Sequence, residues 1–264
     1  MVVDTSGDAL ELNRIAAAVR PLVTNVITFS TVDSTHACAL RLMAQADEEE
    51  VELHPTVILA GCQLHGAGRG GRHWVSPPGN LYLSWLRTDL DGRAVARLPV
   101  LAAAAAHAAV TATGVRGLGI KWPNDLLVGG RKLAGILVQA RHGERTIATV
   151  GLGVNLSGAP TLDDRPLHPP IAATDVLDGA DPQALAESIA ADFVAGLERG
   201  LAEPAPAVEA WRRALVHRPG DPVTVRTAMG HERRGRFLGV TDEGFLRLDA
   251  DDGEFIATGG DVVE

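Results

Sequence analysis

The segment after Pro219 differs in character from the chain before it, and this difference constrains the fold most. Up to residue 218 helical and strand patterns are mixed, without strict strand–helix–strand alternation. From Pro219 on, glycine turns separate short apolar runs and no helical periodicity occurs. We therefore predict an α+β domain over residues 1–218 and a small antiparallel β-barrel over 219–264. The strands that we expect in the barrel are 223–226, 234–240, 245–248 and 254–257.

Periodicity and turn residues predict the elements of the larger domain. The expected helices are 9–20, one that begins at Asp33 or Ser34 and runs through 44, 99–113 with Pro99 in its first turn, 182–201 and 206–216. The expected strands are 26–29, 56–62, 81–86, 120–125 (a strand or turn), 132–140 and 146–156. The expected loops are 64–79, 142–145 and 159–170.

The composition excludes several classes of protein. Of the 264 residues, 46% are hydrophobic and 22% are charged, which is typical of a globular chain. The net charge of -9 argues against binding to DNA, because a nucleic-acid binder needs a basic face. The longest apolar run, 100–110, is too short to cross a bilayer, so we expect no membrane association. Two cysteines, Cys38 and Cys62, without metal-binding spacing fit a reduced cytoplasm.

Lysine is rare in this chain. Lys121 and Lys132 are the two lysines, and the other 22 of the 24 basic residues are arginine. Lysine carries a compact charge on a flexible stem, whereas the guanidinium of arginine is a planar fork. Two lysines close together therefore indicate positions where arginine would not serve, although their survival by chance is the alternative.

Three clusters carry candidate chemistry. The glycine- and arginine-rich loop 66–72 lets backbone approach an anion, or is a plain flexible turn. The second cluster is 121–125 (Lys-Trp-Pro-Asn-Asp) followed by 131–137 (Arg-Lys-Leu-Ala-Gly-Ile-Leu), whose adjacent cations indicate a wet cleft. Asp125 there could hold Mg²⁺ or pair with a cation. The third cluster is 151–155 (Gly-Leu-Gly-Val-Asn), where Asn155 binds a ligand or simply ends the strand.

Together the clusters resemble the biotin protein ligases. Members of that family carry a Gly-Arg-Gly-Arg-Arg-Gly-Arg loop, a Lys-Trp-Pro-Asn-Asp segment, an Arg-Lys-x-Ala-Gly-Ile-Leu strand and a Gly-x-Gly-x-Asn strand in this order. The family's Ser-Thr-Asn segment corresponds to Ser34-Thr35-His36, and 74–84 is also similar to the family. The resemblance is strongest over 25–160. It implies a mixed central sheet flanked by helices, with an SH3-like barrel at the C-terminus.

The resemblance also implies site residues. Lys132 would contact the carboxylate and the α-phosphate as a catalytic residue, together with Arg69 near the acyl-phosphate, and Asp125 would hold Mg²⁺. The residues implied to bind biotin are Ser34, Thr35, His36, Gln63, Gly66, Ala67, Gly68, Arg69, Lys132, Gly135 and Gly153. Those implied to bind the nucleotide are Arg69, Arg72, Trp74 (beside adenine), Lys121, Asn124, Lys132 and Asn155.

Three positions depart from the family pattern. His36 replaces asparagine, and Ala67 and Gly70 replace the first and third arginines of the loop. Because the loop has lost two cations, we expect a weaker grip on an anionic intermediate.

The function that the resemblance implies is ATP-dependent activation of biotin to biotinyl-5'-AMP and transfer to a lysine of the biotin carboxyl carrier domain of an acyl-CoA carboxylase. ATP and Mg²⁺ would be required, and family members include monomers and dimers. A lipoate or octanoate ligase or transferase is the alternative enzyme. A biotin-sensing regulator is a third hypothesis, although only about 25 residues precede the motifs here, whereas the family's DNA-binding domain has some sixty. A binding-only pseudoenzyme is a fourth.

Overall fold

The computed structural model describes residues 9–141, 146–162, 166–227 and 229–263. The expected turn at 142–145 lies outside the described residues, as does part of the expected loop at 159–170.

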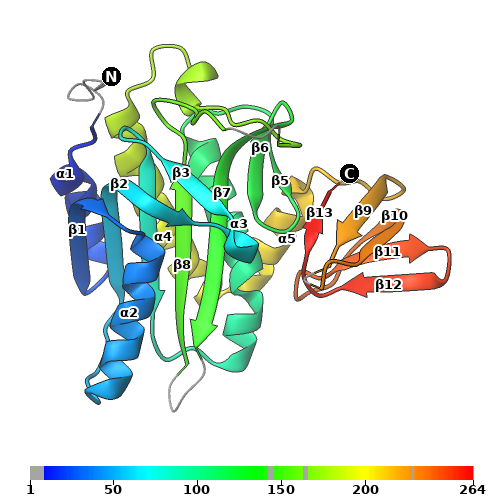
Figure 1. The fold of residues 1–264 in the computed structure, drawn as a ribbon, viewed down its shortest axis with the longest axis horizontal. Helices are drawn as coiled ribbons and strands as arrows, with labels where there is room; N and C mark the ends of the chain where they lie inside the picture. The colour runs from blue at the N-terminus through cyan, green and yellow to red at the C-terminus, as the bar shows by residue number, and fades with distance from the viewer. Residues whose placement is uncertain (1–8, 142–145, 163–165, 228, 264) are drawn as a thin grey trace.

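A mixed eight-stranded sheet forms the centre of the larger domain (Figure 1). Its order is β1-β2-β4-β8-β7-β6-β5, and β3 pairs with β2 at one end. β1 and β2 are parallel, whereas the other neighbours are antiparallel, so the predicted mixed sheet is confirmed. The strands are β1 (Asn25–Val32), β2 (Thr56–Ala67), β3 (His73–Ser76), β4 (Leu81–Arg87), β5 (Leu118–Lys121), β6 (Asp125–Val128), β7 (Arg131–Arg141) and β8 (Ile147–Val154).

Helices cover both faces of this sheet (Figure 1). α2 packs across β2, β4 and β8 on one face, while α1, α3 and α4 pack together on the other. Ser34 caps α2 as expected, because its hydroxyl accepts a hydrogen bond from the backbone N–H of Ala37. The helices are α1 (Leu12–Val19), α2 (Thr35–Glu48), α3 (Gly92–Ala112), α4 (Pro182–Ala202) and α5 (Pro204–Ala214), with short 3₁₀ turns at Arg20–Leu22, Arg69–Gly71 and Ala173–Asp175.

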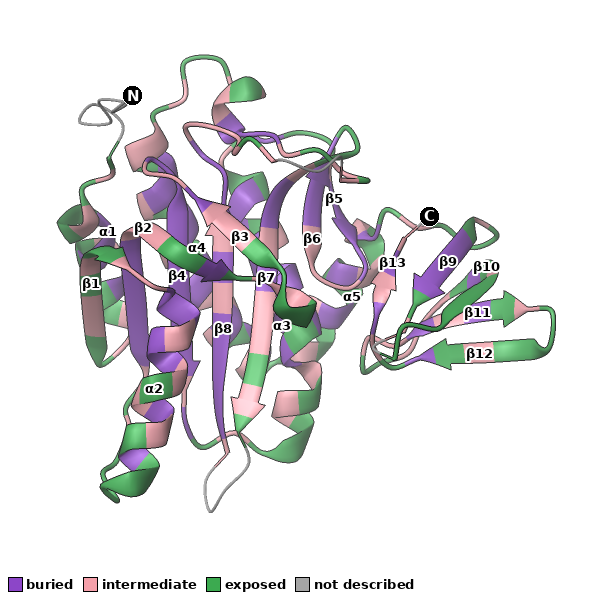
Figure 2. Ribbon diagram, in the orientation of Figure 1, coloured by how far each residue is buried: buried purple, intermediate pink, exposed green. Residues whose placement is uncertain are grey.

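Alternation along β4 shows how the two layers are separated. Leu83 and Trp85 point into the main core beneath α3 and α4, whereas Leu86 packs with Met43 of α2 on the opposite face. Successive side chains of a strand point to opposite faces, and here both faces are covered. β4 is therefore buried on both sides, whereas β7 is only partly buried (Figure 2).

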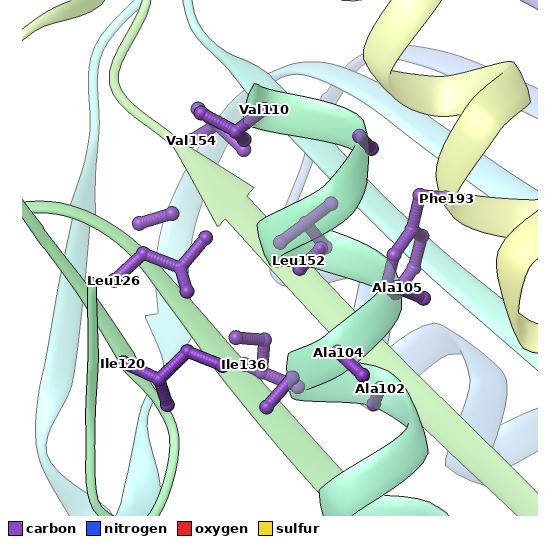
Figure 3. Packing of buried hydrophobic residues seen from close by; sticks show 14 of the residues in the cluster. Ala102, Ala104, Ala105, Val110, Ile120, Leu126, Ile136, Leu152, Val154 and Phe193 are labelled. Atoms are coloured by element: carbon purple, nitrogen blue, oxygen red, sulfur yellow. The ribbon is translucent and has the colours of Figure 1, made fainter. Parts of the chain in front are cut away.

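Helix α3 lies in the middle of the main core. Figure 3 shows its alanines and Val110 packed between Phe193 of α4 and residues of the sheet such as Leu152 and Ile136. Within the described part of the chain, α3 is the helix that is long and apolar enough to cross a membrane, with a mean hydropathy of 1.5. Its apolar composition has a local cause in this structure, because Leu98 and residues 100–106 are buried against protein.

The C-terminal segment forms a second antiparallel sheet, which has the four strands that the sequence predicts and a fifth, β13, that it does not. The order is β12-β11-β10-β9-β13. Its buried side chains are continuous with the main core, and the indole N–H of Trp122 donates to the carbonyl of Gly244 across the junction at 2.8 Å. The domain boundary near residue 218 stays a prediction. The strands are β9 (Pro222–Arg226), β10 (Glu232–Val240), β11 (Leu246–Ala250), β12 (Gly253–Ala257) and β13 (Asp261–Val262).

The structure corrects three expectations. Residues 120–125 are not one element, because β5 ends at Lys121 and β6 begins at Asp125. Residues 64–79 are not one loop, because β2 continues to Ala67 and β3 pairs back onto it. The backbone hydrogen bonds between β2 and β3 therefore keep this segment extended, although it is rich in glycine. The third helix does not begin at Pro99, since α3 begins at Gly92 and Pro99 lies inside it. Asp91 caps that helix by accepting from the N–H of Ala94 at 2.7 Å.

Candidate active site

A pocket of about 750 Å³ opens on the α2 side of the central sheet. This volume is in the range of small-molecule sites. Strands β7 and β8 contribute its floor, the start of α2 one wall, and the segment between β2 and β3 another. Its lining includes Ser34, Thr35, His36, Gln63, Ala67, Gly68, Arg69, Arg72, Trp74, Asn124, Lys132, Gly135, Gly153, Asn155 and Arg226.

Lys132 lines the pocket beside Asp125 and Trp74. Its ammonium lies 2.7 Å from Oδ1 of Asp125 and 5.2 Å from the ring centre of Trp74. The side chain of Lys132 is 26% exposed and that of Asp125 is 15% exposed. A cation held between a carboxylate and an aromatic face is fixed in position and still accessible to a ligand.

Two glycines let the indole of Trp74 lie against the sheet. Gly135 of β7 and Gly153 of β8 are paired in register. A Cβ at Gly135 would lie 2.9 Å from the indole, and a Cβ at Gly153 would lie 2.7 Å from it. Side chains at either position would displace Trp74. A close approach was expected at Gly153 from a ligand or another backbone, and the structure shows that the indole side chain makes it.

A directional chain of hydrogen bonds crosses the wall of the pocket. Ser84 donates its hydroxyl hydrogen to Oγ1 of Thr35 at 2.9 Å, and Thr35 donates from both Oγ1 and its backbone N–H to Oε1 of Gln63. The amide nitrogen of Gln63 donates to Oγ of Ser76 at 2.9 Å, and Ser76 donates to the carbonyl of Trp74. The amide of Gln63 is therefore held in one orientation.

His36 is buried beside this chain, with 5% of its surface exposed. Its Nε2 lies 3.3 Å from Oε1 of Gln139, and its Nδ1 has no partner among the described residues. Burial lowers the pKa of His36. The ring is therefore neutral, and with the hydrogen on Nε2 its Nδ1 is a hydrogen-bond acceptor.

The glycine-rich loop contacts the C-terminal domain through its two arginines. Arg69 Nη1 lies 3.1 Å from Oδ1 of Asp261, and Arg72 Nη2 lies 2.9 Å from Oδ2 of the same carboxylate. Arg69 also donates to Oδ1 of Asn124 and to the carbonyl of Gly260. Burial lowers the pKa of Arg69, and Asp261 opposes that shift.

Two further polar side chains frame the cationic end. Lys121 is 9% exposed and lies opposite Asp125 in the β5–β6 ladder, and burial lowers its pKa while Asp125 opposes the shift. Asn155 donates to the carbonyls of Lys132 and Ile171, which fixes the start of β7. Its Oδ1 is buried without a partner among the described residues.

Comparison with known proteins agrees with this geometry. The model of the biotin/lipoate A/B protein ligase family matches residues 29–156, and that of the biotin protein ligase C-terminal domain matches residues 220–263. A biotin–[acetyl-CoA-carboxylase] ligase of Paracoccus denitrificans is 37% identical over 229 residues, which cover 82% of this chain and 90% of that protein. The chain belongs to the biotin protein ligase family.

Two further proteins are similar to most of this chain. A bifunctional ligase/repressor of Bacillus subtilis is 30% identical over 75% of this chain, and the match covers 62% of that protein. The structure of the Aquifex aeolicus biotin protein ligase with biotin and ATP superposes with a TM-score of 0.70 at 20% identity. It covers 90% of this chain and 97% of that one, so the similarity in fold extends over both domains.

The structure gathers most residues that the resemblance to the ligases implied. All of them line the pocket except Gly66, Lys121 and Asp125. Asp125 lies directly behind Lys132. Gly66 packs against the carbonyl of Trp74, where a Cβ would approach to 2.3 Å, so its position is structural. The assignment of each residue to biotin or nucleotide stays a prediction.

The carboxylates at this site are too few to bind Mg²⁺ by themselves, so a nucleotide would have to supply further oxygen ligands. The described residues contain no cluster of three or more His, Cys, Asp or Glu side chains that could hold a metal. Mg²⁺ is commonly bound by one or two carboxylates, several waters and substrate phosphates. Asp125 is the nearby carboxylate, and the structure shows it paired with the Lys132 ammonium, the second of the two roles that the sequence left open. Its role as a ligand of Mg²⁺ stays a prediction.

Sequence reasoning missed several residues of this ligase site. Ser76 and Ser84 belong to the hydrogen-bond chain, and both lie in the family-like segment 74–84, which was the signal that could have found them. Asp261 and Arg226 come from the C-terminal domain. No local pattern marks Asp261, because its partners lie about 190 residues earlier in the chain. His65 and His73 are both exposed, and His73 also lines the pocket.

Proposed function

We propose that this protein activates biotin with ATP to form biotinyl-5'-AMP and then transfers the biotinyl group to a lysine of a biotin carboxyl carrier domain. The observation that carries the proposal is the set of hydrogen-bonding groups in the pocket wall that can still donate or accept after their bonds within the protein are counted. One N–H of Gln63 is left as a donor after its bond to Ser76. Oγ1 of Thr35 and Nδ1 of His36 can each accept.

A cyclic urea matches this set. Its carbonyl accepts hydrogen bonds, and its two N–H groups donate them, as the ring of biotin does. The dithiolane of lipoate and the chain of octanoate offer neither, so buried polar groups of the wall would be left without partners. Each such group costs about 1–3 kcal/mol. The polar wall therefore favours biotin over the alternative acids.

The reaction joins two anions, and the site supplies positive charge where they meet. A carboxylate oxygen of biotin forms a bond to the α-phosphorus of ATP, and pyrophosphate leaves. Lys132 stabilises the negative charge shared by the carboxylate and the α-phosphate, and Arg69 holds the acyl-phosphate. Mg²⁺ held by Asp125 would neutralise phosphate charge.

The second step needs no nucleophile from the enzyme. The amine of a carrier lysine attacks the acyl carbon, AMP leaves with the electrons of the broken C–O bond, and the nitrogen loses a proton. The residues around the glycine-rich loop exclude water from the mixed anhydride until the carrier arrives. The target that the name of the Paracoccus relative states, acetyl-CoA carboxylase, is the carrier that we propose here. A cytoplasmic location fits this target.

An adenylation assay tests the proposal. The protein is incubated with ATP–Mg²⁺ and with biotin, lipoate or octanoate in separate reactions, and the acyl-adenylate is measured by mass spectrometry. We expect biotinyl-5'-AMP alone. Formation of lipoyl- or octanoyl-AMP at a comparable rate would contradict the choice of acid, and tight biotin binding without pyrophosphate release would indicate a pseudoenzyme.

The match to a bifunctional ligase/repressor supports one second function, biotin-dependent DNA binding. The net charge of -9 argues against it. A gel shift with the upstream region of biotin-synthesis genes, with and without biotin and ATP, decides the question. A specific, salt-sensitive complex would establish the regulatory function.

A further inference from the structure

The two arginines of the glycine-rich loop meet at a single carboxylate of the other domain. Each carboxylate oxygen of Asp261 accepts a hydrogen bond from one of the two arginines. Oδ1 accepts from Arg69 at 3.1 Å, and Oδ2 accepts from Arg72 at 2.9 Å. The side chains of Arg69 and Asp261 are only 26% and 34% exposed. The arm to Arg69 is partly buried and is screened less by solvent than a surface ion pair, whereas the side chain of Arg72 is 59% exposed.

These contacts hold one edge of Arg69 and leave the other free. Nη1 donates to Asp261 and to Asn124, and Nη2 donates to the carbonyl of Gly260. A guanidinium has five N–H groups. The Nε–H and one N–H of Nη2 therefore have no partner among the described residues, and they are free to bind a phosphate oxygen in the pocket that Arg69 lines.

Arg72 stabilises the turn of the 66–72 loop next to Asp261. Its Nε donates to the carbonyl of Arg69 at 3.0 Å, and its own carbonyl accepts from the N–H of Gly68 at 2.8 Å. The ion pair between Arg72 and Asp261 thus fixes the backbone turn that carries Arg69, as well as neutralising charge.

The C-terminal sheet holds Asp261 in place. Asp261 pairs with Arg226 in the antiparallel β13–β9 ladder. Gly260 before it has φ +127°, and a Cβ there would lie 2.3 Å from the carbonyl of Arg226. Only glycine tolerates this conformation and this approach, so the carbonyl that binds Arg69 and the carboxylate beside it are set by the fold of the small domain.

The departures in the loop add a second observation. Ala67 and Gly70 stand where the family pattern has arginine, and Gly70 has φ +62° with open space around it. The two arginines that this chain keeps are the two bound by Asp261. Glycines increase the backbone entropy that the loop loses on ordering, and an anchor outside the loop offsets that loss.

We propose that Asp261 is a positioning residue for the nucleotide half of the site: it anchors the 66–72 loop to the C-terminal domain and presents the free edge of Arg69 to the phosphate. The proposal deepens the ligase function and rests on it for its kinetic consequences. The anchoring itself does not depend on that function.

Proteolysis tests the anchoring without reference to activity. Trypsin cleaves after arginine, so the cleavage rate after Arg69 and Arg72 reports how often the loop opens. In Asp261→Asn we expect cleavage on the order of tenfold faster at both sites, with an unchanged Tm. The matched control is Asp252→Asn, which removes the carboxylate of the exposed Arg233–Asp252 ion pair in the same domain. Equal cleavage rates in the Asp261→Asn protein and the wild type would overturn the proposal.

Steady-state kinetics tests the positioning. Asp261→Asn should raise the KM for ATP about tenfold and change the KM for biotin less than twofold, because one charge-assisted hydrogen bond to phosphate is lost. Asp261→Glu, which keeps the charge, should recover part of the loss. A lower KM for ATP in Asp261→Asn would show that the carboxylate competes with the nucleotide, which would also overturn the proposal. If the wild type forms no adenylate, the ligase function fails, and the proteolysis result still decides whether Asp261 anchors the loop.

Discussion

The ammonium of Lys132 lies 2.7 Å from Oδ1 of Asp125, and the strand register places this pair beside Gly135, which itself pairs with Asp125. The contact explains why lysine was kept here in a chain with 22 arginines. A compact ammonium fits between the carboxylate and the indole of Trp74, whereas a planar guanidinium is larger and binds through a fork.

Lys132→Arg should therefore abolish adenylate formation while the fold survives. We expect pyrophosphate release to fall by about 10²-fold or more, because the charge moves away from the developing oxyanion. Circular dichroism and Tm should stay close to those of the wild type. The matched control is Arg131→Lys at the exposed neighbour, which should retain activity. Wild-type rates in Lys132→Arg would remove this residue from the mechanism.

Gly153→Ala should change the shape of the pocket by displacing the indole of Trp74. The added Cβ would lie 2.7 Å from the indole of Trp74, and overpacking of this kind typically costs about 1–3 kcal/mol. We expect the KM for biotin to rise about tenfold and the tryptophan emission to shift. Gly92→Ala is the control, because a Cβ at the start of α3 meets nothing within 4 Å. An unchanged KM in Gly153→Ala would mean that Trp74 does not shape the biotin site.

Ala67→Arg should tighten retention of the intermediate. Ala67 lines the pocket and lies in extended backbone at the end of β2, so arginine fits there without strain. One more cation beside the acyl-phosphate should slow release of labelled biotinyl-5'-AMP by roughly threefold to tenfold in a chase experiment. Ala67→Gln adds length without charge and should release it as fast as the wild type. Equal release from both variants would refute the effect of charge.

The stability of the protein should fall below neutral pH through His217. Burial lowers the pKa of His217 to about 4, with Lys121 adding to the shift. The unfolded chain binds the proton near pH 6.5, so the stabilisation is complete above that pH and is lost progressively as the pH falls towards 4. The contribution is at most about 1.4 kcal/mol per pH unit.

Urea unfolding at pH 7, 6 and 5 measures this slope. In His217→Gln the slope should be smaller, while the exposed His54→Gln serves as a control that leaves it unchanged. Burial also lowers the pKa of His36 and His107, so part of the slope should remain in His217→Gln. A slope identical to that of the wild type would contradict the burial of a neutral His217.

Local pattern located most elements and much of the site. The helix expected at 182–201 is confirmed as α4, and the helix expected at 206–216 exists as α5 but lies two residues earlier, at 204–214. Apolar residues repeated at helical spacing bury one face whatever the partner is. The start of α3 was misplaced, since Pro99 is a strong local signal and the cap at Asp91 is a weaker one. Strand β3 was missed because its ladder with β2 outweighs the glycines between the two strands.

The sequence by itself determined which side chains could do this chemistry. The two lysines, the glycine-rich loop and the two strands with paired glycines can each be recognised from residue types that lie close together in the chain. Only the tertiary structure decided how they meet. The carboxylate that anchors Arg69 and Arg72, and the chain from Ser84 to the carbonyl of Trp74, join residues far apart along the chain. Such contacts depend on the order of the strands and on the docking of the small domain. Neither can be predicted from the spacing of neighbouring residues in the sequence.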